Sequence, residues 1–274
     1  MQIIYCTLFG NRGASRDIKL TVRAELRLLI DDADVFPLEV FVRMNKVLRE
    51  EKKFLINIAE FRQKSHILEQ ALLQDEHNGV HGYRIRSLYF DTPYDRDFFE
   101  KQAGTELRRK VRLRIYDPEQ TFAMLEMKQK QGAQQLKRSR KISREDAVRI
   151  IKGDLLPLLS HPDPFAAEIY AFMKIHAYRP VAIVEYRRKA FIAKENKIRI
   201  TFDNQIVATE SSFDLFDPKL NMNPVLDPYV VVMEVKFNGF LLGYIRELIN
   251  SINKSELSVS KYVLARQNAY QTHI

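Results

Sequence analysis

The segment KVRLRI carries three cations two residues apart, at Lys110, Arg112 and Arg114. In an extended strand alternate side chains point to the same face, so these cations share one face and the apolar residues between them share the other. A row of like charges repels itself unless water or an anion lies along it. Because the guanidinium group presents a fork of donors that matches phosphate oxygens, phosphate is a suitable anion. The spacing therefore predicts a strand with one phosphate-binding or solvated face.

The same alternation recurs in several other segments that have the composition of strands. Their charged faces combine Glu51 with Lys53, Arg84 with Arg86, Glu126 with Lys128, Glu185 with Arg187 and Lys189, Arg199 with Asp203, and Glu234 with Lys236. One such face is usually the solvated side of a sheet. Repetition in many strands, with arginine favoured and acids few, instead indicates a closed barrel whose charged faces point inward and whose apolar faces pack outward against helices.

A barrel of about eight strands has an interior that side chains fill or that holds one ligand. A basic interior of this kind suits a linear polyphosphate group. The acids inside it have two compatible roles: they neutralise neighbouring cations, or they hold a divalent metal ion on the phosphates, because hard cations prefer carboxylate oxygens. The candidate metal ligands are Glu51, Glu126 and Glu234, of which Glu234 is the first choice.

The composition is that of a basic globular protein. The 274 residues are 46% hydrophobic and 29% charged, and the formal net charge is +9. This charge indicates a polyanionic partner, namely nucleic acid, an anionic membrane surface or a phosphate-rich small molecule. The single cysteine, Cys6, excludes an internal disulfide framework and a cysteine-based zinc site, and it favours a reducing compartment.

The sequence predicts neither a signal peptide nor a membrane-spanning segment. Its first residues lack a basic stretch and a small-residue cleavage pattern. No apolar run is long enough to cross a bilayer. We therefore expect a cytoplasmic protein, and any attachment to the inner face of a membrane would need a membrane-protein partner.

Strand-like segments dominate the chain, joined mostly by hairpins and interrupted by helices. This order predicts an α+β fold with an antiparallel sheet or barrel. One hairpin is expected to turn at Glu195 and Asn196. One short helix is expected to begin at Ser143, which can cap the free N–H groups, and to end at Gly153.

Residues 44–274 are expected to form a single domain, and residues 1–43 differ from them in pattern. The first segment has patchy apolar content without clean strand alternation or a capped helix. It is either an extension, with Met44 as the natural start, or an N-terminal element that packs on the domain.

Residues 47–265 resemble the VTC domain, the catalytic domain of the vacuolar transporter chaperone complex, whose bacterial relatives occur as stand-alone polyphosphate polymerases. The matching stretches, in the order of the family, are REEKKFLI, YRIRSLYFDT, RRKVRLRIY, LEMKQK, VEYRRKAF, IRITFD, MEVKF and SKYV. The ordered set is more specific than any one stretch. The wider superfamily is that of triphosphate tunnel metalloenzymes, so the resemblance implies an antiparallel eight-stranded β-tunnel with helices packed outside.

The alternation and the resemblance together assign candidate site residues. The candidates for catalysis are Lys53, Arg112, Arg114, Lys128, Arg199 and Glu234. The candidates for substrate binding are Arg84, Arg86, Lys110, Lys137, Arg187, Lys236, Ser260 and Lys261. In EYRRKAF, Arg188 is the alternative to Arg187, which strand parity favours. The metal ligand implied by the resemblance is Glu234, with Glu126 and Glu51 beside it.

The resemblance implies an ATP-dependent polyphosphate polymerase. Such an enzyme transfers the γ-phosphoryl group of ATP to a growing inorganic polyphosphate chain, releases ADP, and uses Mn²⁺ or Mg²⁺. The acceptor is a phosphate oxyanion, so no Ser, Cys or His nucleophile is required, and positioning with charge stabilisation suffices.

Two other functions remain open on the sequence. One is a metal-dependent hydrolase of tripolyphosphate or nucleoside triphosphates on the same fold. The hydrolase and cyclase branches carry E-x-E-x-K in the first strand, where this chain has Arg49, Glu51 and Lys53, which fits the polymerase branch better. The other is a non-catalytic polyanion-binding module, although nucleic acid is not expected because few aromatic residues interleave with the basic strands.

Overall fold

The computed structural model describes residues 49–132, 134–252 and 259–271. The expectations for residues 1–43 and for Met44 lie outside these residues. The chain divides into two compact units. The smaller unit includes Leu155–His176, and the larger unit includes Lys46–Asp154 and Ala177–Ile274.

The described part of the smaller unit is helical. A 3-10 helix, η1 (Leu156–Ser160), packs on the helix α7 (Pro164–Ile175). Asp163 caps α7, and its carboxylate accepts a hydrogen bond from the backbone N–H of Phe165 at 2.9 Å. Proline at the first position of α7 suits the helix because that N–H would have no intrahelical partner.

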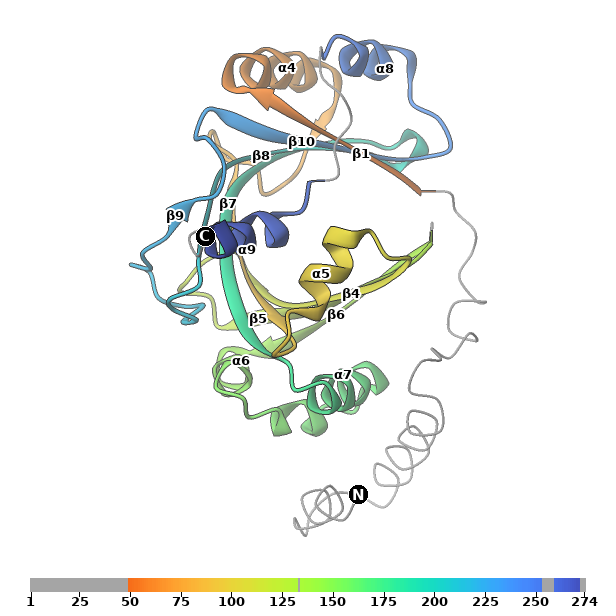
Figure 1. The fold of residues 1–274 in the computed structure, drawn as a ribbon. Helices are drawn as coiled ribbons and strands as arrows, with labels where there is room; N and C mark the ends of the chain where they lie inside the picture. Colours follow the sequence, from red (N-terminus) through yellow and green to blue (C-terminus); the bar gives the residue numbers. More distant parts are fainter. Residues whose placement is uncertain (1–48, 133, 253–258, 272–274) are drawn as a thin grey trace. The chain divides into compact units, whose positions relative to one another are not determined.

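The larger unit is built on one antiparallel sheet, shown in Figure 1. Eight long strands follow each other across it in the order β1-β10-β8-β7-β3-β4-β5-β6. Their bounds are β1 (Arg49–Asn57), β3 (Tyr83–Asp91), β4 (Leu107–Ile115), β5 (Phe122–Gln131), β6 (Gln134–Ser143), β7 (Arg179–Ala193), β8 (Ile198–Thr209) and β10 (Val230–Asn238). Two short strands lie off this path: β2 (Leu73–Gln74) pairs with β7, and β9 (Asn223–Pro224) pairs with β8.

The sheet curls so that its two ends face each other across one side, as Figure 1 shows. Lys128 on β5 lies 3.9 Å from Glu51 on β1, although these strands are not neighbours in the sheet. The expected eight antiparallel strands are confirmed, but the path is open, because no strand pairing joins β1 to β6 among the described residues. Charged and polar side chains on both end strands suit edges that pair with no further strand.

One face of the sheet can be traced from strand to strand because directly opposite residues share a face. From β1 to β6 the opposite pairs are Lys53–Glu234, Glu234–Thr201, Thr201–Ala190, Arg188–Tyr83, Tyr89–Arg112, Arg112–Glu126 and Lys128–Lys137. Where the residue changes within one strand, as from Ala190 to Arg188, the two residues are an even number apart and so share a face. Since Glu51 and Lys128 meet across this side, it is the concave side. We call it the inner face.

The outer face over β1, β8 and β10 is apolar and is covered by two helices. Phe54, Ile200 and Val235 belong to one buried cluster on it, together with Leu68 of α4 (Ile58–Ala71) and Ile245 of α8 (Gly243–Asn250). Figure 1 shows both helices outside the curl. This arrangement confirms that apolar strand faces pack outward against helices, and it leaves the charged residues of these strands on the inner face.

Two further helices cover one end of the inner face. In α9 (Lys261–Gln271), Tyr262 is buried and stacks on Tyr89 at a ring-centroid distance of 5.1 Å. Its hydroxyl donates to Asp91, whose carboxylate also accepts from the backbone N–H groups of Asp97 and Phe98 in α5 (Arg96–Ala103). Asp91 therefore ties β3, α5 and α9 together.

Two local predictions are confirmed. The helix α6 (Arg144–Ile151) begins after Ser143, whose hydroxyl accepts from the N–H of Asp146 at 3.0 Å. The β7–β8 hairpin turns through Glu195–Lys197. Among the described residues of both units, no helix combines the length and hydropathy that crossing a bilayer requires.

Candidate functional site

The inner face gathers basic side chains from most strands of the curl and from the start of α9. They are Lys53, Lys110, Arg112, Arg114, Lys128, Lys137, Arg188, Arg199, Lys236 and Lys261. The carboxylates beside them are fewer: Glu51, Asp75, Glu126, Asp203 and Glu234. Each of these acids contacts at least one of the cations, and the balance of charge on this face is positive.

The first group lies where β1 and β10 pair. The ammonium of Lys53 lies 2.6 Å from Glu51 and 3.3 Å from Glu234. Lys236 contacts the same two carboxylates, at 3.6 Å from Glu51. Burial would raise the pKa of Glu234, but Lys236, Lys53 and Lys261 hold it well below its ordinary value. Both acids are thus ionised and shared between cations.

Two lysines beside this group are driven toward their neutral form. Burial lowers the pKa of Lys128 to about 8, with Lys236 and Lys53 adding repulsion and Glu51 opposing it. Burial and the nearby Lys128 lower the pKa of Lys110 well below its ordinary value. The amine of Lys110 donates to the hydroxyl of Ser260 at 2.7 Å. A bound anion would stabilise the charged form of both lysines, because an opposite charge favours the protonated form.

The second group lies on β4, β5 and β6 around Glu126. Arg112 donates its Nε to one carboxylate oxygen of Glu126 at 2.7 Å, and Lys137 lies 2.5 Å from the other. Arg114 lies 3.7 Å from the same acid. Burial would raise the pKa of Glu126, but Arg112, Arg114 and Lys137 together lower it to about 2. Glu126 therefore positions two arginines and a lysine on one side of the inner face.

The third group joins β7 and β8 to α9. Arg188 forms a bidentate ion pair with Asp203, over 2.6 and 2.8 Å. Lys261 of α9 lies 2.5 Å from the same carboxylate, and its ammonium lies 4.7 Å from the ring centroid of Tyr186. Burial would raise the pKa of Asp203, but Arg188 and Lys261 lower it. Asp203 thus positions one cation from the sheet and one from the helix.

The last group surrounds Arg199 at the start of β8. Its guanidinium donates to Asp75 at 2.7 Å and to the hydroxyl of Tyr83 at 3.2 Å. Asp75 also accepts from the backbone N–H of His77 and contacts the His77 ring, at 3.1 and 3.0 Å. Arg199 is more exposed than Arg188, with 33% against 14% of the side chain accessible.

The prediction that Arg84, Arg86 and Arg187 line the interior is wrong, because the structure places all three on the outer face. Arg86 is buried there, donating to Glu185 at 2.6 Å and to the carbonyl oxygens of Leu215 and Asp217. Arg84 lies 3.6 Å from Glu185 and pairs across the strands with Arg187. Parity correctly grouped Glu185 with Arg187, but it does not say which face points inward. Here Arg188 lies on the inner face.

The structure brings the other predicted residues to the inner face. The predicted residues found there are Glu51, Lys53, Lys110, Arg112, Arg114, Glu126, Lys128, Lys137, Arg199, Glu234 and Lys236, with Ser260 and Lys261 at the start of α9. Sequence reasoning missed Asp75, Tyr83 and the role of Asp203. For Asp203 a signal existed in the sequence, because it lies an even number of residues after Arg199 and so on the same face of the predicted strand.

A divalent metal ion can be tested against the donors present. Among the described residues no cluster of three or more His, Cys, Asp or Glu side chains could by itself hold a metal ion. Glu51 and Glu234 share Lys53 and Lys236, and Mg²⁺ is commonly bound by one or two carboxylates with phosphate oxygens and water. This pair fits an ion that binds together with phosphate. Glu126 shares none of its cations, Arg112, Arg114 and Lys137, with these two acids, which fits charge neutralisation.

Comparison with known proteins places this chain in a family. The sequence matches the family model described as VTC domain over residues 48–270. No curated protein matches it. Similar solved structures include a candidate adenylate cyclase from Bacillus halodurans, 13% identical with a TM-score of 0.44, covering 78% of this chain and 95% of that one. A protein from Pyrococcus horikoshii is 12% identical with a TM-score of 0.41, covering 80% and 99%. These distant likenesses carry no argument about activity, so the assignment rests on the domain match.

Proposed function

Because the chain belongs to the VTC domain family, we propose that it is an ATP-dependent polyphosphate polymerase. It would transfer the γ-phosphoryl group of ATP to the end of an inorganic polyphosphate chain held along the inner face, and it would release ADP. Such an enzyme would work in the cytoplasm and would be compatible with a membrane-protein partner.

The observation that supports this proposal best is the row of shared ion pairs on the inner face. Glu126 alone contacts Arg112, Arg114 and Lys137, and Asp203 contacts Arg188 and Lys261. Because the cations outnumber the carboxylates on this curved face, they can bind a further anion without a large rearrangement. A polyphosphate chain supplies that charge at regular intervals, whereas a single phosphate would satisfy only one of the groups.

The residues can lower the barrier to phosphoryl transfer by position and charge. Donor and acceptor are both anions, so bringing them into line requires cations around the transferred group. Arg112 and Arg114 are held on one side of the inner face by Glu126, and Arg199 is held on the other by Asp75. Because these guanidinium groups are oriented before substrate arrives, little reorganisation is needed in the transition state.

Glu234 and Glu51 are the residues that would hold Mn²⁺ or Mg²⁺ in the proposed enzyme. The ion would supply charge neutralisation on the phosphate oxygens. Their proximity to Lys53 and Lys236 keeps both carboxylates ionised without substrate, because these lysines lower the pKa of each acid against the effect of burial. The acids are therefore in the form that a metal ion requires.

The dependence of ADP release on an acceptor tests this proposal against a hydrolase. With ATP and Mn²⁺, added short-chain polyphosphate should accelerate ADP release by the full chain, because each added chain end is an acceptor. ADP formed with an equal amount of orthophosphate, and unaffected by added chains, would instead identify a hydrolase. Binding of polyphosphate without any ADP release would identify a non-catalytic polyanion-binding module.

A further inference from the structure

Three aromatic rings cluster beside Arg199 and Asp75. The ring centroid of His77 lies 5.8 Å from that of Tyr83 and 6.4 Å from that of Tyr116, and the last two lie 6.3 Å apart. The His77 and Tyr116 planes are within 17° of parallel. The chain contributes these rings from three separate places: the turn after β2, the start of β3 and the residue after β4. We call them the ring cluster.

Two rings of the cluster, those of His77 and Tyr116, are exposed, and Tyr83 is half-buried. Tyr116 is 40% accessible, and the side chain of His77 is 65% accessible. Aromatic rings usually bury most of their area in a core or an interface. Exposed rings that hold each other in place offer flat apolar surface to a ligand at little cost in conformational entropy.

Asp75 couples the ring cluster to the inner face. One of its carboxylate oxygens contacts the His77 ring at 3.0 Å, and the other accepts from Arg199 at 2.7 Å. The hydroxyl of Tyr83 also accepts from Arg199, at 3.2 Å. The rings and a cation of the inner face are therefore fixed relative to each other, so a ligand that has both a flat ring and phosphates could contact both at once.

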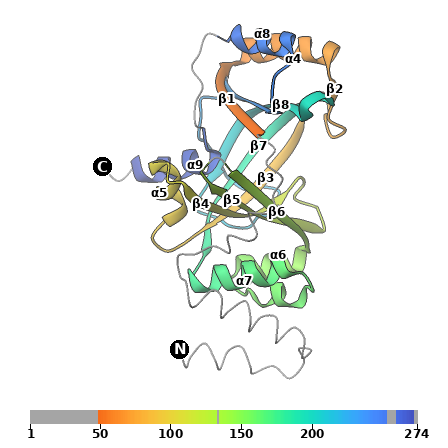
Figure 2. The same ribbon diagram turned by 90° about the vertical axis from the view of Figure 1, so that its right-hand side faces the viewer.

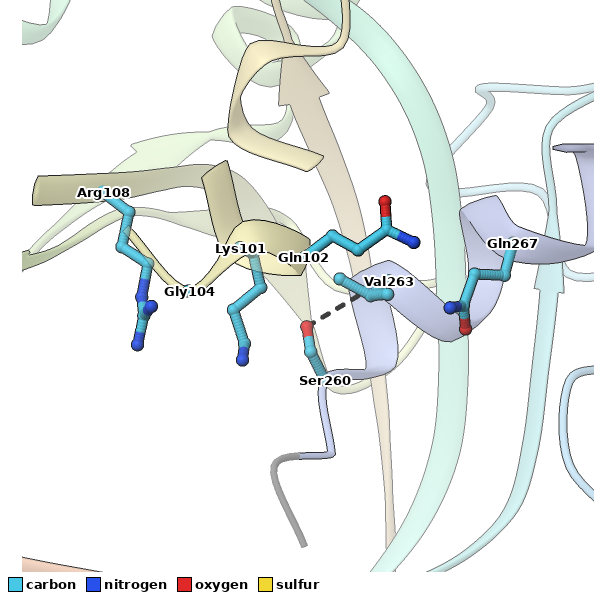
Figure 3. Close-up of a pocket in the computed structure, with 7 residues that line it drawn as sticks. All are labelled: Lys101, Gln102, Gly104, Arg108, Ser260, Val263 and Gln267. Carbon is cyan, nitrogen blue, oxygen red and sulfur yellow. Dashed lines mark hydrogen bonds between the residues drawn. The ribbon is translucent and has the colours of Figure 1, made fainter. Parts of the chain in front are cut away.

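The opposite end of the inner face has different chemistry. A cavity of about 490 Å³ lies there between α5, β4 and α9, lined by Lys101, Gln102, Gly104, Arg108, Ser260, Val263 and Gln267. Figure 3 shows Lys101 and Arg108 extending in the same direction, and none of the described residues that line the cavity is aromatic. Figure 2 shows β2 on one side of the sheet and the α5–α9 pair on the other. One end thus offers aromatic rings, and the cavity at the other offers two cations, Lys101 and Arg108, among mostly polar residues.

We propose that the ring cluster is the site where the nucleobase of the ATP donor stacks, with the triphosphate running past Arg199 onto the inner face. This inference rests on the proposed function and adds the direction in which the phosphate chain runs along the inner face. The nucleotide binds at the β2 end, and the phosphate chain extends toward the cationic cavity at the α5–α9 end. Stacking tolerates any base, because every base has a flat π-face, so the site should accept other purine nucleotides.

Binding of two ligands that differ only in the nucleoside tests the proposal. The first is the non-hydrolysable β,γ-imido analogue of ATP, and the second is inorganic tripolyphosphate. In the double variant His77→Ala/Tyr116→Ala, calorimetry on the full chain should show about tenfold weaker binding of the analogue, since loss of base stacking has effects of this size. Binding of tripolyphosphate should stay within about twofold of the wild type, which also shows that the variant is folded.

The matched control is Tyr229→Ala, which removes a tyrosine that is 71% accessible and lies just before β10. It should bind both ligands as the wild type does. Equal loss of both ligands in the double variant, or an unchanged affinity for the analogue, would overturn the nucleobase site and leave the polymerase proposal standing. A wild-type protein that binds neither ligand would overturn both.

Discussion

Arg188 and Asp203 lie directly opposite each other on β7 and β8 and form a bidentate ion pair over 2.6 and 2.8 Å. The Asp203 side chain is fully buried, and Lys261 of α9 lies 2.5 Å from the same carboxylate. The neighbouring Arg187 lies on the outer face, in line with Arg84. Two adjacent arginines in one strand therefore have different surroundings, which makes them a matched pair for mutation.

Replacing Arg188 with alanine should weaken tripolyphosphate binding by about tenfold or more, because a charge-assisted pair with phosphate is lost from the inner face. It should also lower the free energy of unfolding by about 3 kcal/mol, since Asp203 is left buried with Lys261 alone. Arg187→Ala should change both quantities little. Calorimetry and urea unfolding measure the two effects, and equal effects for both variants would show that the assigned faces are wrong.

The pKa of Glu126 leads to a prediction about stability and pH. It is about 2 in the folded protein, against an ordinary value of 4.5, because Arg112, Arg114 and Lys137 overcome the effect of burial. A depressed carboxylate pKa stabilises the fold above about pH 4.5, and this stabilisation is lost as the pH falls toward the folded value. At pH 7 it amounts to about 3 kcal/mol.

The variant Glu126→Gln removes this contribution and leaves the three cations without their acid. Urea unfolding at pH 7 should therefore show a free energy of unfolding about 3 kcal/mol below that of the wild type. The difference should shrink to about half at pH 3, because the wild type has then lost part of the same contribution. A difference that stays constant between these pH values would contradict the ion pairs around Glu126.

Lys128 predicts how anion binding depends on pH. Burial, with Lys236 and Lys53, lowers its pKa to about 8, so in the free protein it is mostly charged at pH 7 and mostly neutral at pH 9. Only the charged form attracts phosphate, so binding above pH 8 must take up a proton, and this uptake weakens affinity as the pH rises. Tripolyphosphate affinity should therefore fall between pH 7 and pH 9 more steeply in the wild type than in Lys128→Arg, whose side chain stays charged. Parallel pH profiles for the two proteins would exclude this role.

Glu234 is the residue whose loss should separate turnover from binding. Glu234→Gln keeps the shape of the side chain but removes the charge that would hold a metal ion, so ADP release should fall by about 100-fold or more. Tripolyphosphate binding measured without metal should not weaken, because a carboxylate that competes for Lys53 and Lys236 is gone. Glu185→Gln, on the outer face, is the control for ADP release. Turnover near the wild-type rate in Glu234→Gln would refute the metal role.

The residue pattern predicted the strands and most of the inner face, because alternation is a property of the sequence itself. Lys53, Arg112, Lys128 and Glu234 all lie on one face as expected. Alternation does not determine which of the two faces of a strand points inward. The β3 to β4 connection contains a helix, so nothing local sets the register that places Tyr89 opposite Arg112 and Ser87 opposite Arg114, with Arg86 on the other face.

The error at β7 could have been avoided from the sequence. A hairpin that turns at Glu195 and Asn196 sets the pairing of its two strands, and this pairing continues without a shift from Ala193 and Ile198 to Arg188 and Asp203. Asp203 shares a face with Arg199, so Arg188 must share it too. The ring cluster, by contrast, joins residues far apart in the chain and required the fold.

The product formed from ATP tests the central proposal most directly. After incubation of the full chain with ATP and Mg²⁺, ³¹P NMR should show signals of internal chain phosphates together with those of ADP, and the Glu234→Gln protein should give neither. Orthophosphate and ADP alone, with no internal phosphate signal, would contradict a polymerase.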